Sequence, residues 1–576
     1  MPAPASPDLR THLSSLFEEA IRKVAPALPA SPRIVLETPR QSAHGDYACT
    51  VALQLAKLLR RAPREIAAQL VAALPASQYL EKAEIAGAGF INLFLKRSFK
   101  QQVVNRILAT GAAYGTSALG RRKKVQVEFV SANPTGPLHV GHGRGAAYGA
   151  SLANVLAAAG FEVSREYYVN DAGRQMDILA LSTWLRYLEA CGVTVAFPAN
   201  AYQGKYVRDM ARTLRDKHQA RFQRDAPAVT AADEEGRLDM LIAAAKAALG
   251  ADYEVMHGFA LNEQLADCRD DLAEFGVAFD HWFSERSLYD SGRVEQAINL
   301  LEERGHVFTE GGARWFRSSA FGDEKDRVVQ RENGQHTYFA SDIAYHLDKF
   351  KRGFDLVIDV WGADHHGYIP RVKGALTALG LNAEQLTIAL VQFAVLYRGG
   401  QKVAMSTRAG EFVTLRELRR EVGNDAARFF YVLRKGDQHL DFDLDLAKSQ
   451  SNDNPVYYVQ YAHARVCSLL EQWGGDAAGL AAADTAALES EQELTLLSRL
   501  LEYPETVESA ARDLSPHVIA FYLRQLAADF HSYYNATRLL VEDEKVKRAR
   551  LALGAAVRQV LRNGLALLGV SAPDKM

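Results

Sequence analysis

Residues 125–142 have the sequence VQVEFVSANPTGPLHVGH, and a run of small residues, GRGAAYGASLANVLAAAG, continues to Gly160. The apolar and β-branched residues of Val125–Val130 predict a strand. Proline and glycine in the next segment predict a loop, and the alanine-rich run predicts a close-packed helix. A strand, a glycine-rich turn and a helix in this order open a parallel α/β unit, so the segment predicts an α/β fold.

Two histidines, His139 and His142, stand three residues apart where the predicted helix begins. Residues at this spacing share one face of a helix. Backbone N–H groups and the positive end of the helix dipole point to the same place, and Gly141 lets a planar ring or a phosphate approach the backbone. The pattern favours a nucleotide site in which the histidines donate hydrogen bonds to developing phosphate charge. For an isolated pair of this kind, capping and packing alone, or metal ligation, are the alternatives.

The composition is that of an ordinary globular chain. It has 576 residues, 48% hydrophobic and 24% charged, and a net charge of −2. These values exclude a mainly disordered chain, a collagen-like fibre and a small disulfide scaffold. They also exclude a chain that is basic throughout, although local basic surfaces can still bind nucleic acid.

The cysteines and the apolar runs predict a cytoplasmic location. Four cysteines lie far apart without a C-x-x-C pair, so we expect neither structural zinc nor a disulfide framework. The start, MPAPASPDLR, predicts no signal peptide. The longest uncharged run, Gly145 to Phe161, is shorter than the about 20 apolar residues of a membrane helix, so we expect no membrane contact. We expect a monomer.

The rest of the chain divides into three predicted domains, 1–119, 120–448 and 449–576. The first has the pattern of an α+β unit, with a helix break at Ala62-Pro63 and a strand at Phe90–Leu95. The second contains further strand-like runs at Phe354–Gly362 and Leu386–Leu396. Mostly helical, charged sequence between about Met176 and Arg314 is interpreted as insertions. From Asp425 onward the pattern predicts helices to the end.

The segment HVGH resembles the HIGH signature of class I aminoacyl-tRNA synthetases, and EFVSANPTGPLHVGH is similar to the form found in arginyl-tRNA synthetases. Other segments resemble that family in the same order: HGDYA (44–48), GFINLF (89–94), YQGKYVRDMA (202–211), TYFASDIAYH (337–346), WGADHHGY (361–368), AMSTRAG (404–410), NPVYYVQYAHAR (454–465) and GVSAPDKM (569–576).

The resemblance implies a multi-domain α/β protein. Its parts are a Rossmann-like class I catalytic domain with helical insertions, an N-terminal α+β domain that binds the tRNA D loop, and a C-terminal all-α anticodon-binding domain. The implied reaction activates L-arginine with ATP and Mg²⁺ and transfers it to the tRNA for arginine, with activation requiring bound tRNA.

Arginine needs carboxylates for its guanidinium. Tyr338 and Asp342 are four residues apart and share a helix face, while Glu128 stands near the end of the first strand, where α/β folds place ligands. Asp342 alone could equally be a solvated helix charge. The resemblance implies that arginine is bound by Glu128, Asn133, Tyr338 and Asp342, with Ser131 beside them.

The resemblance also implies the nucleotide site. It assigns His139, His142 and Gly141 to ATP, Gly362 and His366 to the adenosine, and Met405 and Ser406 to the second signature. Asp364, His365 and His366 could be interpreted as a metal cluster. No further Cys or His at a suitable spacing supports this interpretation.

The second class I signature, KMSKS, is altered here to Ala404-Met405-Ser406-Thr407-Arg408, so its usual second lysine is missing. Gly136 stands where some arginyl enzymes place a compensating lysine. Lys402 and Arg408 are the local candidate cations for the phosphates, and Arg144 is a further one. Lys402 and Arg408 could also be ordinary loop charges.

An aromatic and basic stripe points to RNA. Tyr458, Tyr461 and Arg465 lie on one helical stripe, and such groups suit splayed-out bases, although aromatic residues at this spacing often form a core. The resemblance adds Tyr534 and Met576 for the anticodon. It adds Phe90 and Asn92, on one strand face, for the D loop, with a core position as the alternative for Phe90.

Two functions from other classes are the alternatives: a HIGH-type nucleotidyltransferase without tRNA, and a non-catalytic RNA-binding paralogue. The helical C-terminal pattern argues against the first, and the intact set of Glu128, Asn133, His139, His142 and Asp342 argues against the second. We expect no hydrolytic proofreading domain.

Overall fold

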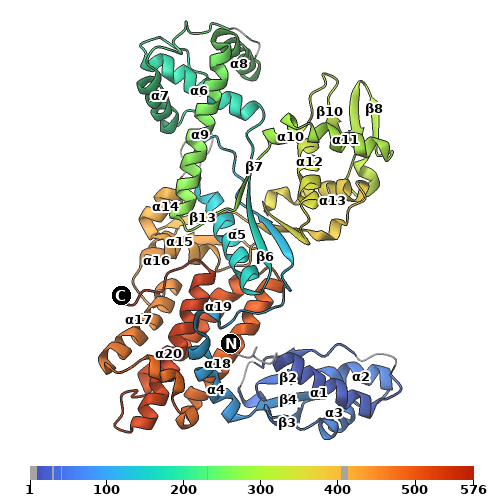
Figure 1. The fold of residues 1–576 in the computed structure, drawn as a ribbon, viewed down its shortest axis with the longest axis vertical. Helices are drawn as coiled ribbons and strands as arrows, with labels where there is room; N and C mark the ends of the chain where they lie inside the picture. The colour runs from blue at the N-terminus through green and yellow to red at the C-terminus, as the bar shows by residue number, and fades with distance from the viewer. Residues whose placement is uncertain (1–8, 29–31, 40–41, 230, 232, 404–412) are drawn as a thin grey trace.

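The computed structural model describes residues 9–28, 32–39, 42–229, 231, 233–403 and 413–576. Figure 1 shows an elongated molecule. The N-terminal unit, in blue, lies to one side of a column of C-terminal helices, in orange and red, and two insertions project from the opposite end. The parallel sheet that carries the predicted site lies between the two ends.

The N-terminal unit is a four-stranded antiparallel sheet with three helices. The strand order is β1 (Leu36–Glu37), β2 (Tyr47–Cys49), β4 (Phe90–Leu95) and β3 (Leu80–Ala86), and the helices are α1 (Leu9–Val24), α2 (Val51–Leu59) and α3 (Pro63–Ala73). Pro63 occupies the first turn of α3, where its missing N–H costs nothing, which confirms the predicted helix break. Phe17, Leu55, Leu70 and Ile91 are fully buried in a core of this unit's own.

The central sheet has five parallel strands. The order is β12 (Leu386–Val391), β11 (Leu356–Gly362), β5 (Lys124–Glu128), β6 (Glu162–Val169) and β7 (His281–Ser284). Helix α5 (Val140–Ala158) is the crossover from β5 to β6, as the small-residue run predicted. Gly149 packs on the ring of Phe129 so closely that a Cβ would overlap it, which explains why small residues fill this helix.

Two insertions interrupt the sheet. The first contains α6 (Arg174–Ala190), α7 (Lys205–His218), α8 (Glu234–Leu249) and α9 (Ala251–Glu274), packed around a separate core. The second contains α10 (Arg286–Asp290), α11 (Arg293–Glu303), an antiparallel sheet of β8 (Val307–Glu310), β9 (Ala313–Phe316) and β10 (Arg327–Gln330), and α12 (Tyr338–Lys351); α13 (Ile369–Ala378) follows β11.

The prediction for 176–314 was therefore incomplete. Residues 281–284 form β7, an edge strand of the main sheet between the two insertions. Four residues are too few to show a period against the long helical sequence around them.

The C-terminal part begins with a small sheet of β13 (Ala394–Arg398), β14 (Gln401–Lys402) and β15 (Leu440–Asp443) and the short helices α14 (Leu415–Val422), α15 (Asn424–Tyr431) and α16 (Leu444–Lys448). The bundle itself contains α17 (Pro455–Trp473), α18 (Glu491–Arg512), α19 (His517–Ala536) and α20 (Glu544–Leu567). Strand β15 corrects the expectation of helices throughout from Asp425. Across the described ranges, no helix is long and apolar enough to cross a membrane.

Helix α4 (Arg97–Thr110) packs against α18 and α20. The side chains of Gln101 and Asn105 donate to backbone carbonyls of residues 481–488 at 2.9–3.0 Å. In return, Asn563 of α20 donates to the carbonyls of Gly111 and Tyr114, both at 3.0 Å. The segment that follows the N-terminal core is thus built into the C-terminal bundle.

Candidate active site

The predicted site residues gather at the carboxyl edge of the five-stranded sheet. Glu128 ends β5, Asn170 follows β6, Glu285 follows β7 and Gly362 ends β11. Since these strands are parallel, their carboxyl ends meet at one edge, where open α/β sheets bind ligands.

The two histidines of HVGH are fixed by the first turn of α5. The Gly141 N–H donates to His139 Nδ1 at 3.1 Å, and the His139 N–H donates to His142 Nδ1 at 3.3 Å. Their rings stack with centroids 3.7 Å apart. Burial lowers the pKa of His139, and burial together with the charge of His139 lowers the pKa of His142 to about 3. Both rings are therefore neutral, and because each Nδ1 accepts a backbone N–H, each carries its proton on Nε2.

Glycine is required beside these histidines. A Cβ on Gly141 would lie 2.8 Å from the His139 ring and 3.1 Å from the ring of Phe393. Phe393 also lies within 3.6 Å of the Cβ position on Gly362, and its side chain is 49% exposed. Gly141 and Gly362 therefore lie on either side of the Phe393 ring. His366 is exposed on the 3-10 turn Ala363–Tyr368 that follows β11.

A cleft of about 1070 Å³ opens in front of the histidines. The HVGH loop and the first insertion line it, with residues that include Asn133, Gly136, His139, His142, Tyr202, Tyr206 and Glu417. The Tyr206 hydroxyl donates to the carbonyl of Thr135 at 2.7 Å, so the insertion is tied to the loop. The cleft is large enough for a nucleoside beside the phosphate-binding turn.

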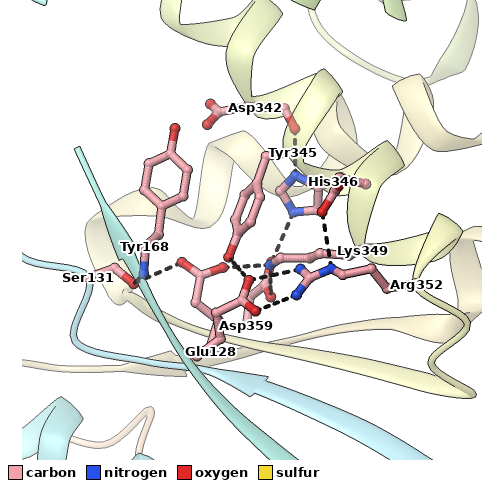
Figure 2. Close-up of polar contacts among 11 residues, drawn as sticks. Glu128, Ser131, Tyr168, Asp342, Tyr345, His346, Lys349, Arg352 and Asp359 are labelled. Atoms are coloured by element: carbon pink, nitrogen blue, oxygen red, sulfur yellow. Dashed lines mark hydrogen bonds and ion pairs between the residues drawn. The ribbon is translucent and has the colours of Figure 1, made fainter. Parts of the chain in front are cut away.

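Three carboxylates converge on the other side of the loop. Burial and then the negative charges of Glu285, Asp342 and Glu128 raise the pKa of the Tyr168 hydroxyl, so all three lie near it. Figure 2 shows Tyr168 to one side of Glu128 and Asp342. Such a cluster suits a ligand with two positive groups.

Glu128 is held at both carboxylate oxygens. Ser131 Oγ donates to Oε1 at 2.9 Å, and Lys349 Nζ lies 2.5 Å from Oε2 (Figure 2). Lys349 also donates to Asp359 at 2.7 Å, and His346 Nε2 lies 2.9 Å from the second oxygen of Asp359. Sequence analysis missed Lys349 and Asp359, because a lysine at the end of a helix and an aspartate inside a strand carry no local signal of burial.

The first turns of α12 carry Tyr338 and Asp342, which were predicted to bind arginine. Tyr338 is 56% exposed, whereas Asp342 is half-buried and accepts a hydrogen bond from the Tyr368 hydroxyl. Burial raises the pKa of Asp342. Asn133 is exposed in the loop and donates to Gln175 at 2.8 Å.

Glu285 is a site residue that sequence analysis missed. Its side chain is 2% exposed and accepts from Ser341 Oγ at 2.7 Å and, with the Asn170 amide in the orientation that satisfies both groups, from Asn170 at 2.7 Å. Burial, followed by the charges of Asp342 and Asp171, raises the pKa of Glu285 to about 7. Glu285 directly follows β7, and because this strand was not predicted, the position of Glu285 at the sheet edge was not recognised.

Arg144 is not a phosphate-binding cation, and this hypothesis is wrong. Its side chain is 1% exposed, and its guanidinium donates to four backbone carbonyls, those of Gln392 and Gln438 at 2.8 Å, Lys435 at 3.0 Å and Tyr431 at 3.4 Å. Lys402 is exposed in β14. The other predicted phosphate contacts, Met405, Ser406 and Arg408, lie outside the described residues.

The predicted anticodon residues on α17 surround a histidine that was not predicted. The Tyr458 and Tyr461 rings lie 4.6 and 5.5 Å from the ring of His531. Arg465 bonds to His531 Nδ1 at 3.0 Å and lies 4.3 Å from the ring centre of Tyr534. The four predicted residues are thus together and only partly buried, which excludes a purely core role.

The other predicted RNA contacts lie elsewhere. Met576 is 51% exposed and borders a separate cavity of about 720 Å³ with Tyr457 and Gln460. In the N-terminal unit, Phe90 is 37% exposed, which excludes the core alternative, while Asn92 is 7% exposed in the middle of the sheet.

Three potential metal ligands lie close together in the C-terminal bundle. His463, Cys467 and Asp574 offer atoms within 4.8 Å of one another. Arg558 donates to the Cys467 sulfur at 4.0 Å, and Arg562 donates to Asp574 at 3.2 Å. The two guanidinium groups therefore already supply positive charge to this cluster. We assign no metal to it.

A parallel sheet with a neutral histidine pair at the first crossover helix is typical of class I aminoacyl-tRNA synthetases. Family models agree: "tRNA synthetases class I (R), catalytic domain" matches 103–242 and 254–436, "Arginyl tRNA synthetase N terminal domain" matches 11–95, and "DALR anticodon binding domain" matches 459–576. The chain belongs to the arginyl-tRNA synthetase family, and it is an enzyme.

Relatives support the same family along the whole chain. The chain is 68% identical to an arginine–tRNA ligase of Nitrosospira multiformis, over 100% of both chains, and 66% identical to one of an Azoarcus species, over 99% of this chain and 100% of the relative. The solved Thermus thermophilus arginyl-tRNA synthetase is 26% identical, with a TM-score of 0.76 over 99% of this chain and 100% of that chain. These matches confirm the predicted family and fold class.

Proposed function

We propose that this enzyme forms arginyl-adenylate from L-arginine and ATP at the carboxyl edge of the central sheet and passes the arginyl group to the terminal ribose of its cognate tRNA. The observation that carries the proposal is the pairing of two sites at one edge. Neutral histidines with Nε2–H groups stand on one side, and the carboxylates Glu128, Asp342 and Glu285 stand on the other.

The carboxylate cluster supports arginine as the amino acid. Asp342 and Glu285 would accept the guanidinium, whose forked donors match two carboxylates, with Tyr338 closing the outer side. The donors that reach Glu285 within the described ranges are neutral hydroxyl and amide groups, so the residue still needs a cation. Glu128, Ser131 and Asn133 at the end of β5 would bind the α-amino end.

The chemistry needs positioning and charge stabilisation more than proton transfer. MgATP enters as the substrate, with Mg²⁺ on its phosphate oxygens. An oxygen of the arginine carboxylate attacks the α-phosphorus, and the bond to the bridging oxygen breaks and releases pyrophosphate. The Nε2–H groups of His139 and His142 donate to the phosphoryl oxygens as charge develops.

The adenosine would lie against Gly141 and Gly362, with His366 near it. Lys402 and Arg408 are the proposed cations for the leaving pyrophosphate, and Met405 and Ser406 the other contacts of that loop. In the second step a ribose hydroxyl oxygen of tRNA attacks the arginyl carbonyl carbon. The bond from that carbon to the anhydride oxygen breaks, AMP leaves with the electron pair, and the hydroxyl proton is released with it.

RNA recognition is proposed for both ends of the molecule. The anticodon would bind at Tyr458, Tyr461, Arg465 and Tyr534, where aromatic rings and a guanidinium are gathered for stacking, and at Met576. The D loop would contact Phe90 and Asn92. The match to an anticodon-binding domain argues against a nucleotidyltransferase that works without tRNA.

We also propose that the enzyme works as a cytoplasmic monomer. Its four cysteines are all free, which fits a reducing compartment. Sedimentation at micromolar concentration would test the monomer.

Arginine-dependent ATP–pyrophosphate exchange, measured with and without tRNA, tests the function. We expect exchange only when arginine and the cognate tRNA are both present. Exchange at full rate without tRNA would contradict the proposed tRNA requirement, and no exchange in any mixture would contradict the function.

A further inference from the structure

The ammonium of Lys349 is the buried cation beside the proposed amino-acid site. The side chain is 0% exposed, and Nζ lies 2.5 Å from Glu128, 2.7 Å from Asp359 and 4.3 Å from the centre of the Tyr345 ring (Figure 2). Because no part of the side chain reaches the surface, Lys349 cannot touch a substrate. Any effect it has on the reaction must pass through the groups it contacts, Glu128, Asp359 and Tyr345.

The charge state of this group follows from its neighbours. Burial lowers the pKa of Lys349, but Asp359 and Glu128 together raise it by more, so the ammonium is charged. For Glu128 burial outweighs its neighbours, and its pKa is raised. Burial raises its pKa, and Lys349 is the largest influence that lowers it. Without that ammonium, burial and the charge of Asp359 would favour a protonated Glu128.

Other charged groups around Glu128 do not replace Lys349. His346 of α12 lowers the pKa of Glu128 but bonds directly to Asp359, at 2.9 Å. Glu166 of β6 adds negative charge and is already paired with Arg352 at 2.5 Å. Asp359 of β11 also adds negative charge.

The orientation of Glu128 depends on Lys349 as well. Lys349 holds Oε2 while Ser131 holds Oε1, and Ser131 in turn accepts the Tyr168 N–H at 3.1 Å. Lys349 stands seven residues after Asp342 on α12, about 10 Å along the helix axis. The ion pair therefore ties the helix that carries the specificity residues to the strand end that carries Glu128.

We propose that Lys349 is a positioning residue for amino-acid binding: it favours the ionised form of Glu128 and holds the carboxylate in the orientation that binds the α-ammonium of arginine. The inference rests on the proposed function, in which Glu128 binds that group. It assigns Lys349 an effect on arginine affinity and on its pH dependence, and none on ATP.

Lys349→Met, a neutral side chain of similar length, tests the proposal. In tRNA-supported exchange we expect the KM for arginine to rise about tenfold or more, while the KM for ATP changes less than about twofold. The acid limb of kcat/KM for arginine should move to higher pH by about one unit, because Glu128 then protonates more easily. Unchanged arginine KM and an unmoved limb would overturn the proposal.

Arg352→Met is the matched control. Arg352 caps the same helix and forms the neighbouring, partly buried ion pair with Glu166, without a bond to Glu128. Its loss should lower the melting temperature but leave the arginine KM and the acid limb in place. If both variants shift these two quantities equally, Lys349 has only a structural role.

Glu128→Gln separates this inference from the proposed function. If the inference holds, Glu128→Gln raises the arginine KM and Lys349→Met adds nothing in that background. If Glu128→Gln has no effect on arginine, the proposed role of Glu128 fails first. Where Lys349→Met does not fold, the charge-balanced Lys349→Met/Asp359→Asn variant is used, with the same expected and contradicting results.

Discussion

At the scale of single residues, the carboxylates of the site differ in whether the protein itself supplies a countercharge. Glu128 has Lys349, whereas Glu285 is met by the Ser341 hydroxyl and the Asn170 amide. A buried carboxylate with neutral partners binds either a proton or a ligand cation. Glu285 is therefore the residue at which arginine and protons compete.

The competition predicts how arginine affinity depends on pH. With a pKa of about 7, Glu285 is mostly ionised at pH 8 and mostly protonated at pH 6, so a guanidinium must displace a proton at the lower pH. The KM for arginine should rise about tenfold from pH 8 to pH 6. Glu285→Gln should bind arginine weakly at both pH values and lose this slope.

Exchange assays at pH 6, 7 and 8 measure the effect, and the KM for ATP in the same assays is the control. A wild-type arginine KM that is flat over this range would contradict the assignment of Glu285 to the guanidinium.

The histidine pair and the buried charged residues of the site show how much of it could be predicted from the sequence. His139 and His142 were found because their environment is local: the first turn of α5 supplies both backbone donors. Glu285 and Lys349 were not found, because their environment comes from strands and helices distant along the chain. Their burial is a property of the assembled sheet, which no local pattern contains.

At the scale of elements, Arg144 joins α5 to the segments that follow the central sheet. Its guanidinium donates hydrogen bonds to the backbone carbonyls of Gln392 after β12, of Tyr431 in α15 and of the loop 435–438. An uncompensated carbonyl in the interior is costly, so one side chain fixes the backbone that flanks the nucleotide side of the site. Arg144 was a candidate phosphate-binding cation because it follows HVGH, but its buried contacts indicate a structural role.

Arg144→Met should therefore destabilise the protein rather than weaken ATP binding selectively. Removal of the guanidinium leaves several buried carbonyls without donors, and we expect a loss of about 3 kcal/mol or more. Thermal unfolding measures it, with the exposed Arg434→Met as the matched control. A variant with normal melting temperature and a raised KM for ATP would restore the phosphate-binding hypothesis.

At the scale of the whole molecule, three units were predicted from composition and resemblance, but their packing was not. The N-terminal unit has its own core, with Phe17, Leu55 and Ile91, and Leu501 of α18 packs against its edge. Helix α4 belongs to that unit by sequence order and packs with α18 and α20 instead. Its amphipathic pattern could be recognised from the sequence, but such a pattern does not specify which partner covers the apolar face.

This packing predicts different outcomes for two N-terminal truncations. A chain that begins at Arg97 keeps α4, with Val103, Val104 and Ile107 at most 1% exposed in the bundle, and should unfold cooperatively near the temperature of the full chain. A chain that begins at 120 loses α4 and exposes the apolar surface beneath it, as well as the carbonyls that Gln101 and Asn105 satisfy, and should aggregate. Size-exclusion chromatography and circular-dichroism melting of both chains distinguish the cases. If the shorter chain is as stable and monodisperse as the longer one, α4 is not part of the C-terminal core.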